Sequence, residues 1–116
     1  MSILIDQLKD YGCDIDEAMS RFLNNEAFYE RCFLKFLDDT TFEGLGAVLS
    51  TQSVSDSFDM AHNLKGVSAN LGITPLYNEV SEMVESLRAG ILPENSMESY
   101  ARIMNIRDDL RKIAGK

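Results

Sequence analysis

The sequence predicts an all-α protein, an up-and-down four-helix bundle with additional short helices at its N-terminus. Apolar residues recur at intervals of three and four and rarely alternate, which is the period of a helix and not of a half-buried strand. Residues that begin and end helices separate these periodic segments. The chain has 116 residues, 45% of them apolar, so we expect a single domain over residues 1–116 with one hydrophobic core.

Helix-starting residues set the expected element boundaries. The expected helices cover about residues 14–22, 25–38, 41–50, 54–71, 74–89 and 95–113. Their capping or first residues are Asp14, Asn25, Thr41, Ser53, Thr74 and Asn95. Pro75 favours a helix start after residue 73, because the fixed φ of proline suits the first helical position. The last four helices, within about residues 41–113, form the expected bundle core.

The N-terminal segment 1–13 precedes these helices and contains a short amphipathic stretch, Ile3–Leu8. Such a stretch can either cap the end of the bundle or offer a docking surface to a partner. Capping is the favoured interpretation, and residues 1–13 are therefore treated as a capping segment.

Charge and hydropathy exclude several classes of partner. The chain carries 11 basic and 19 acidic residues, a formal net charge of −8, whereas nucleic-acid binders need clustered basic residues to displace counterions. The same charge argues against an anionic membrane surface, and no apolar run approaches the length of a membrane span. Residues 1–9 lack the pattern of a secretion signal, and two cysteines without a disulfide pattern fit a reducing cytoplasm.

The residues for several kinds of active site are missing. A catalytic triad or a zinc site needs partners that converge on one point, and the chain has one histidine and two isolated cysteines, Cys13 and Cys32. Cys32 is one turn from Phe28 and Phe36, so we interpret it as a buried small apolar residue. No glycine-rich phosphate loop is present. We therefore expect no metal, nucleotide or other cofactor to be bound by this chain.

His62 lies on a helix face that the core does not need. Helical residues advance by about 100° each, which places Phe58, Ala61, Leu64, Ser68 and Leu71 on one apolar stripe. The opposite side carries Ser55, His62, Gly66, Ala69 and Ile73. The imidazole is therefore expected to point at solvent, ringed by small side chains, with Lys65 within its reach. A neutral imidazole beside an ammonium group can accept one anionic group, and a phosphoryl is the candidate.

Gly66 lies one turn after His62 inside the same helix. A glycine there is less favourable than alanine by about 1 kcal/mol, so its presence needs a reason. Either a partner approaches the backbone closely at this point, or the glycine packs tightly against a neighbouring helix. Close approach by a partner is favoured, because Gly66 lies away from the apolar stripe.

The segment Ala61–Gly72, Ala-His-Asn-Leu-Lys-Gly-Val-Ser-Ala-Asn-Leu-Gly, resembles the signature of histidine-containing phosphotransfer (HPt) domains. The resemblance continues through Gly12–Phe22, Phe28-Tyr29 and Phe33–Leu37 upstream, and through Leu76, Met83 and Leu87–Gly90 downstream. It covers most of residues 12–90. The flanking matches matter, since a histidine followed by lysine and glycine alone would be weak evidence.

The resemblance implies that His62 takes a phosphoryl group from a phospho-aspartate of one receiver domain and passes it to another. Lys65 would offset charge on the transferring group, Gly66 would let the partner's active site close over it, and the receiver would supply Mg²⁺. The implied partners are response-regulator receiver domains and a hybrid sensor kinase. The expected partner-docking residues are Asn63, Ala69, Asn70 and Ile73. The chain would be a monomeric cytoplasmic carrier without an ATP site or autokinase activity, and not an enzyme.

Val84 departs from the family pattern, because this position is often acidic or amide-bearing in relatives. Glu85 follows it and is expected to point elsewhere on its helix. A hydrogen bond from that helix to the imidazole is then in doubt, although Asn63 or Asn70 could partly replace it.

Two other functions compete with the phosphoryl carrier. A phosphorylation-independent adaptor could dock on a receiver or kinase domain and sequester it, which explains the fold but not His62. A subunit of a larger assembly would need an apolar stripe beyond those of the bundle core, and the sequence shows no clear one.

Overall fold

The computed structural model describes residues 2–116, and that part of the chain is helical without any strand. Its elements are α1 (Ile3–Asp10), α2 (Ile15–Met19), the 3-10 helix η1 (Ser20–Phe22), α3 (Glu26–Leu37), α4 (Thr41–Ser50), α5 (Val54–Leu71), α6 (Thr74–Arg88) and α7 (Ser96–Ile113). The predicted all-α class is confirmed. The helix boundaries agree with expectation to about one residue, except that the segment 14–22 divides into α2 and η1.

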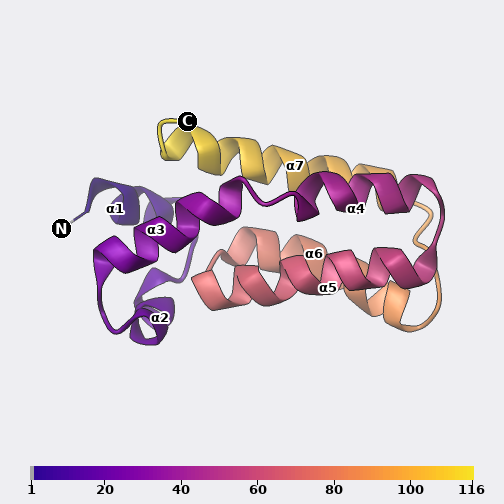
Figure 1. Ribbon diagram of the computed structural model, residues 1–116, viewed down its shortest axis with the longest axis horizontal. Coiled ribbons are helices and arrows are strands. Elements are labelled where there is room, and N and C mark those ends of the chain that lie inside the picture. The colour runs from indigo at the N-terminus through magenta and orange to yellow at the C-terminus, as the bar shows by residue number, and fades with distance from the viewer. Residues whose placement is uncertain (1) are drawn as a thin grey trace.

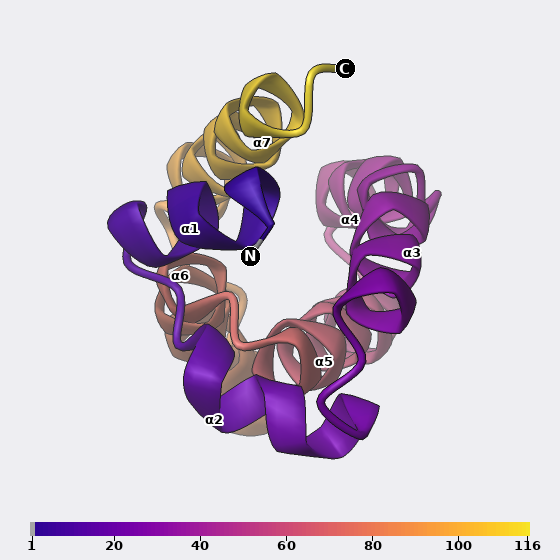
Figure 2. The ribbon, with the colours of Figure 1, turned by 90° about the vertical axis from the view of Figure 1, so that its left-hand side faces the viewer.

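The four C-terminal helices lie alongside one another in an elongated molecule of 44 × 25 × 21 Å (Figure 1). Helix α5 packs against α4 and α6, and α7 packs against α6 and α4. The short N-terminal helices lie at one end, where α1 contacts α7 and α3 while α2 contacts α5 (Figure 2). One long face of α5 is therefore left outside the core.

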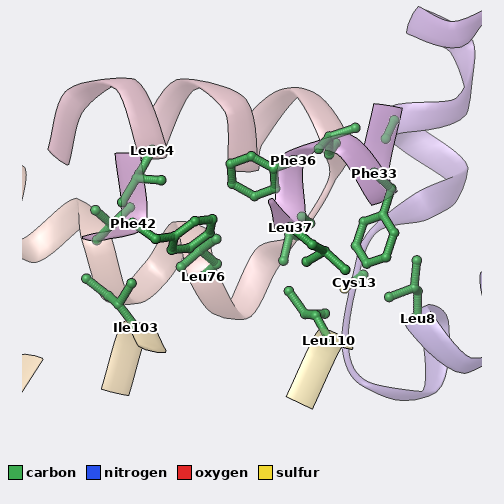
Figure 3. Packing of buried hydrophobic residues seen from close by; sticks show 14 of the residues in the cluster. Leu8, Cys13, Phe33, Phe36, Leu37, Phe42, Leu64, Leu76, Ile103 and Leu110 are labelled. Carbon is green, nitrogen blue, oxygen red and sulfur yellow. The ribbon is translucent and has the colours of Figure 1, made fainter. Parts of the chain in front are cut away.

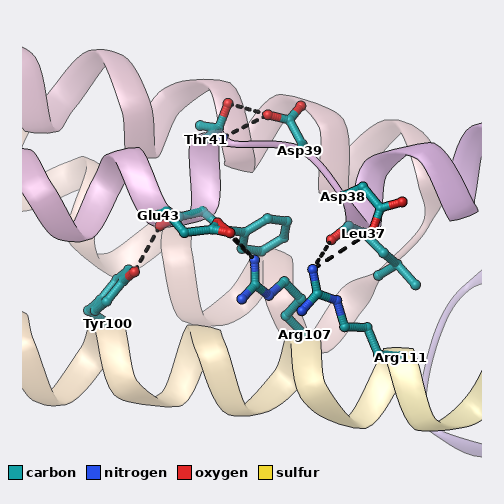
Figure 4. Close-up of polar contacts among 9 residues, drawn as sticks. Leu37, Asp38, Asp39, Thr41, Glu43, Tyr100, Arg107 and Arg111 are labelled. Atoms are coloured by element: carbon teal, nitrogen blue, oxygen red, sulfur yellow. Dashed lines mark hydrogen bonds and ion pairs between the residues drawn. The ribbon is translucent and has the colours of Figure 1, made fainter. Parts of the chain in front are cut away.

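Local capping explains where most helices begin. Ser53 Oγ accepts a hydrogen bond from the Asp56 N–H at the start of α5 (3.2 Å). At the start of α3, Asn25 Oδ1 accepts one from the Phe28 N–H (3.0 Å). At α4 the N-cap Thr40 makes no side-chain bond, and Asp39 before it takes this part, since its Oδ1 accepts from both the N–H (2.8 Å) and the hydroxyl (2.6 Å) of Thr41 (Figure 4). These bonds satisfy N–H groups that a helix leaves unpaired in its first turn.

Residues from every α-helix contribute to one hydrophobic core (Figure 3). Ile5 and Leu8 of α1 belong to it, so the amphipathic N-terminal stretch covers an end of the core. The expectation for the cysteines was wrong in one respect, because Cys32 is only partly buried whereas Cys13 is buried. Burial raises the pKa of the Cys13 thiol to about 11, which keeps it protonated at neutral pH.

Polar contacts join α7 to α4 and to the C-terminal end of α3 (Figure 4). Arg107 is a buried residue, 7% exposed, and donates from Nη1 to both carboxylate oxygens of Glu43 (2.8 and 2.9 Å). The Tyr100 hydroxyl donates to the Phe42 carbonyl (3.0 Å), and Arg111 Nη2 donates to the Leu37 carbonyl (2.9 Å). These contacts hold α7 against α4.

The Glu43→Gln variant is expected to lose stability at neutral pH and little at acid pH. The hydrogen bond from Arg107 holds the pKa of Glu43 below its usual range, so the ionised carboxylate stabilises the fold above about pH 4.3. That contribution disappears as the pH falls through the lowered folded-state pKa. Melting temperatures of wild type and variant should differ at pH 7 and converge near pH 3.

Glu94→Gln is the matched control for this prediction, since it removes the same charge at an exposed position in the α6–α7 connection. It should leave the melting temperature close to that of wild type at both pH values. A Glu43→Gln deficit that persists unchanged at pH 3 would show that packing, and not the ionised carboxylate, accounts for it.

None of the helices in residues 2–116 combines the length and apolar character needed to cross a membrane.

Candidate functional site

Helix α5 presents His62 at the middle of its outer face. Its buried residues are Ser57, Ala61, Leu64, Ser68 and Leu71, which confirms most of the expected stripe. Partly buried apolar residues pack beside this stripe: Val54, Phe58, Met60 and Val67. His62, Gly66 and Ala69 are exposed, as expected. The 18-residue helix therefore holds the imidazole on a rigid support that is packed from behind.

The imidazole has an aromatic neighbour. The ring of Phe58, one turn earlier, stacks on His62 with 5.3 Å between the centroids and 26° between the planes. Phe58 was expected on the buried stripe, but it is only partly buried and packs against the edge of the core. The expectation that small side chains alone surround His62 was therefore wrong, because one of its sides is covered by an apolar ring.

Lys65 lies on the side of α5 that meets α6. Its Nζ is 5.8 Å from the centroid of the Tyr77 ring and 3.7 Å from Glu85 Oε1. Its side chain is 23% exposed, so the stem is packed while the ammonium stays at the surface. The ammonium is thus held one turn from His62 by two residues of the next helix.

Glu85 points toward Lys65 of α5 and away from the buried side of α6 that holds Val84, a contact with Lys65 that the sequence did not predict. Its Oε1 is 3.7 Å from Lys65 Nζ and also 3.7 Å from Arg88 Nε. The Arg88 guanidinium lies 5.2 Å from the centroid of the Phe58 ring, and this ring is the one that stacks on His62. The sequence interpretation missed Tyr77 and Arg88 as parts of the site, although the spacing of residues 77, 85 and 88 places them on one side of a helix.

Val84 is fully buried, which explains the apolar residue at this position of α6. It completes the core-facing side of that helix together with Leu76, Val80, Met83 and Leu87. Asn63 does not replace the missing polar group, because its Nδ2 donates to Thr41 Oγ1 of α4 (3.4 Å).

Gly66 has open space outside it. A Cβ placed on this glycine would meet no atom within 4 Å, so tight packing against a neighbouring helix is excluded as its explanation. The glycine instead borders a shallow hollow lined by Glu17, Arg21, Ala69 and Asn70. The backbone of α5 is therefore accessible one turn after His62.

Arg21 is a third residue that the sequence interpretation missed. It donates from Nη2 to the Ala69 carbonyl (2.9 Å) and from Nε to the Asn70 carbonyl (3.2 Å) near the C-terminal end of α5. It also forms paired bonds to Glu17, and this arginine holds the pKa of the Glu17 carboxyl below its usual range. A cation at the carbonyl end of a helix is electrostatically favourable, and here it ties the segment after α2 to the His62 face.

Of the expected docking residues, Asn63, Ala69 and Asn70 are exposed on α5, whereas Ile73 is fully buried. The expectation for Ile73 was wrong because α5 ends at Leu71. Gly72 follows with a φ of +71° and turns the chain, so the rotation of 100° per residue no longer applies at residue 73. Ile73 enters the core as the residue before α6.

Residues 2–116 contain no group of three or more histidine, cysteine or acidic side chains placed to hold a metal ion. Comparisons with models of protein families, with curated proteins and with solved structures found no significant match to the chain.

Proposed function

We propose that this chain is a histidine-containing phosphotransfer protein, which relays a phosphoryl group between aspartates of receiver domains through His62. In this proposal α4 to α7 form the four-helix bundle of that family, with the N-terminal helices as its end cap. The observation that carries the proposal is the exposed imidazole on the outer face of α5, next to a held ammonium group and an open glycine.

Transfer would proceed in line at the phosphorus atom. The lone pair of an unprotonated imidazole nitrogen forms the N–P bond while the P–O bond to the receiver's aspartate breaks, and the carboxylate keeps that electron pair. Positioning and charge neutralisation supply most of the catalysis in such transfers. His62 is positioned by the packed helix, and the Lys65 ammonium lies where it can offset negative charge on the phosphoryl group.

The remaining components would come from the partner. The receiver domain would supply Mg²⁺ together with the phospho-aspartate, and its active site would close over α5 at Gly66. Partners of this kind are receiver domains of response regulators and of a hybrid sensor kinase. The chain would act as a monomeric carrier in the cytoplasm, without autokinase activity and without binding nucleic acid or membranes.

The test is incubation with a receiver domain that carries a labelled phosphoryl group, in the presence of Mg²⁺. We expect label on this chain that is lost in acid and stable in alkali, as for a phosphoramidate and unlike an acyl phosphate. Label that is stable in acid and lost in alkali, or no label from a panel of receivers, would refute the proposal.

Substitutions at Gly66 should separate stability from transfer. Gly66→Ala is expected to raise the free energy of unfolding by about 0.5–1 kcal/mol, because glycine is unfavourable in an exposed helix interior. Gly66→Leu should keep most of this gain, since nothing surrounds the site. Its side chain would however hold a docked receiver away, and a misfit of even 1.4 kcal/mol slows transfer about tenfold.

Urea unfolding and single-turnover transfer rates measure the two effects. The result that contradicts the proposed role is a Gly66→Leu variant that transfers at the rate of wild type. Loss of stability in Gly66→Ala would instead show that the open space beside this glycine is filled in the folded protein.

A further inference from the structure

Glu85 is shared by the two cations that border the His62 face. Its Oε1 is 3.7 Å from Lys65 Nζ and 3.7 Å from Arg88 Nε. Both cations also lie over aromatic rings, Lys65 at 5.8 Å from Tyr77 and Arg88 at 5.2 Å from Phe58. These ring contacts do not involve the carboxylate, so we expect them to keep the cations at the α5–α6 boundary when Glu85 is not their partner.

The ion pairs with Glu85 are loose. Both distances exceed the 2.7–2.9 Å of a charge-assisted hydrogen bond, and the side chains of Glu85 and Arg88 are 64% and 52% exposed. Exposed pairs of this kind contribute little and are easily broken. A phosphoryl group carries a charge of about −1.5 to −2 and three strong acceptor oxygens, so it would compete well for the same cations.

We propose that Glu85 is an exchangeable counterion, which pairs with Lys65 and Arg88 while His62 is unphosphorylated and yields them to the phosphoryl group when His62 is phosphorylated. This inference rests on the proposed function. It assigns Arg88 as a second cation for the phosphoryl group and Glu85 as the counterion of both cations. The negative charge of Glu85 then remains near the phosphoryl group and destabilises it, which favours onward transfer.

The charged groups near the imidazole come from two helices. Helix α6 contributes Glu85 and Arg88, and α5 contributes Lys65 and the exposed Asp59, less than one turn before His62. Asp59 stays in every variant below, so a change caused by Glu85 can be read separately from it.

The experiment uses phosphoramidate as a small phosphoryl donor for the intact chain. The donor nitrogen, protonated by the solvent, leaves as ammonia when its P–N bond breaks, and the new P–N bond forms at His62. A ³¹P NMR titration of the phosphorylated protein then measures the pKa of the phosphohistidine side chain. This pKa reports the electrostatic potential at the phosphorus and is not moved by a purely structural role.

We expect Glu85→Gln to lower this pKa by about 0.3–0.8 unit, the effect of one charge at several ångströms in a largely aqueous surrounding. Glu82→Gln is the matched control, because Glu82 lies on the same helix but borders a hollow with Ser99 and Arg102 of α7. It should lower the pKa by less than half as much. The difference should shrink in 1 M salt, where the Debye length is about 3 Å.

A second readout follows the Arg88 Nε–H resonance, which should shift when wild type is phosphorylated. Equal pKa changes in the two variants, or an Arg88 resonance that does not respond to phosphorylation, would overturn the inference. Since phosphoramidate replaces the receiver domain, these outcomes are independent of the receiver experiment. A chain that passes the titration but accepts nothing from receivers would refute only the proposed function.

Discussion

The His62→Gln variant is expected to accept no phosphoryl group from a phosphorylated receiver domain and to remain folded. An amide side chain has no basic nitrogen to form the N–P bond, so label should fall to background. Glutamine is a good helix former, and His62 is exposed, so stability should change by about 0.5 kcal/mol or less. Transfer of labelled phosphoryl and thermal unfolding followed by circular dichroism measure the two results.

Binding to the receiver distinguishes the carrier from the adaptor. The proposed docking residues Asn63, Gly66 and Ala69 remain in the variant, so for the proposed carrier affinity should change little while signalling output is lost. A phosphorylation-independent adaptor requires that both binding and output survive the substitution. Label that persists at the level of wild type in His62→Gln would place the phosphoryl group on another residue.

The helices could be predicted from the sequence because their signals are local. Ser53 caps α5 with a bond to a residue three positions away, and Pro75 lies in the first turn of α6. The exposure of His62 also follows from one helix alone, since the apolar stripe of α5 identifies the face that packs. Features that depend on a single period of 3.6 residues were therefore mostly correct, with Phe58, which is only partly buried, as an exception.

The features of the site that the sequence did not predict are contacts between different elements. The period of α6 places Glu85 on a face, but it does not show how α6 is rotated against α5, and so it could not predict that Glu85 meets Lys65. The stacking of Phe58 on His62 and the position of Arg88 over Phe58 depend on the same rotation. Arg21 was missed because its acceptors are backbone carbonyls 48 and 49 positions away, for which no side-chain pattern exists.

Ile73 shows how far a helical period can be extended. Its angular position agrees with the His62 face only if the helix continues, and Gly72 is the residue that ends it. A glycine after a helix is a recognised stop signal, so the burial of Ile73 could have been predicted by applying that signal before the angular rule.

Replacing Gly72 by alanine is expected to destabilise the fold by about 2–5 kcal/mol, from a left-handed backbone and from overpacking. Gly72 has a φ of +71°, a conformation that L side chains rarely adopt. A Cβ at this position would also collide with the Asp14 carbonyl oxygen and lie 2.9 Å from the Ala18 Cβ. The start of α2 would therefore have to move. The hydrogen bond from the Asp14 N–H to the Gly72 carbonyl (2.8 Å) opposes this movement.

Gly90→Ala separates the two causes of this loss. Gly90 has a φ of +83°, but a Cβ there would meet nothing within 4 Å, so this variant should show only the backbone penalty of about 1–2 kcal/mol. Urea unfolding of both variants measures the difference, which is the penalty of displacing α2 from the end of α5. Equal losses would mean that α2 yields freely. In that case Arg21, which follows α2 and binds the Ala69 and Asn70 carbonyls, could not hold the surface beside Gly66 in a fixed shape.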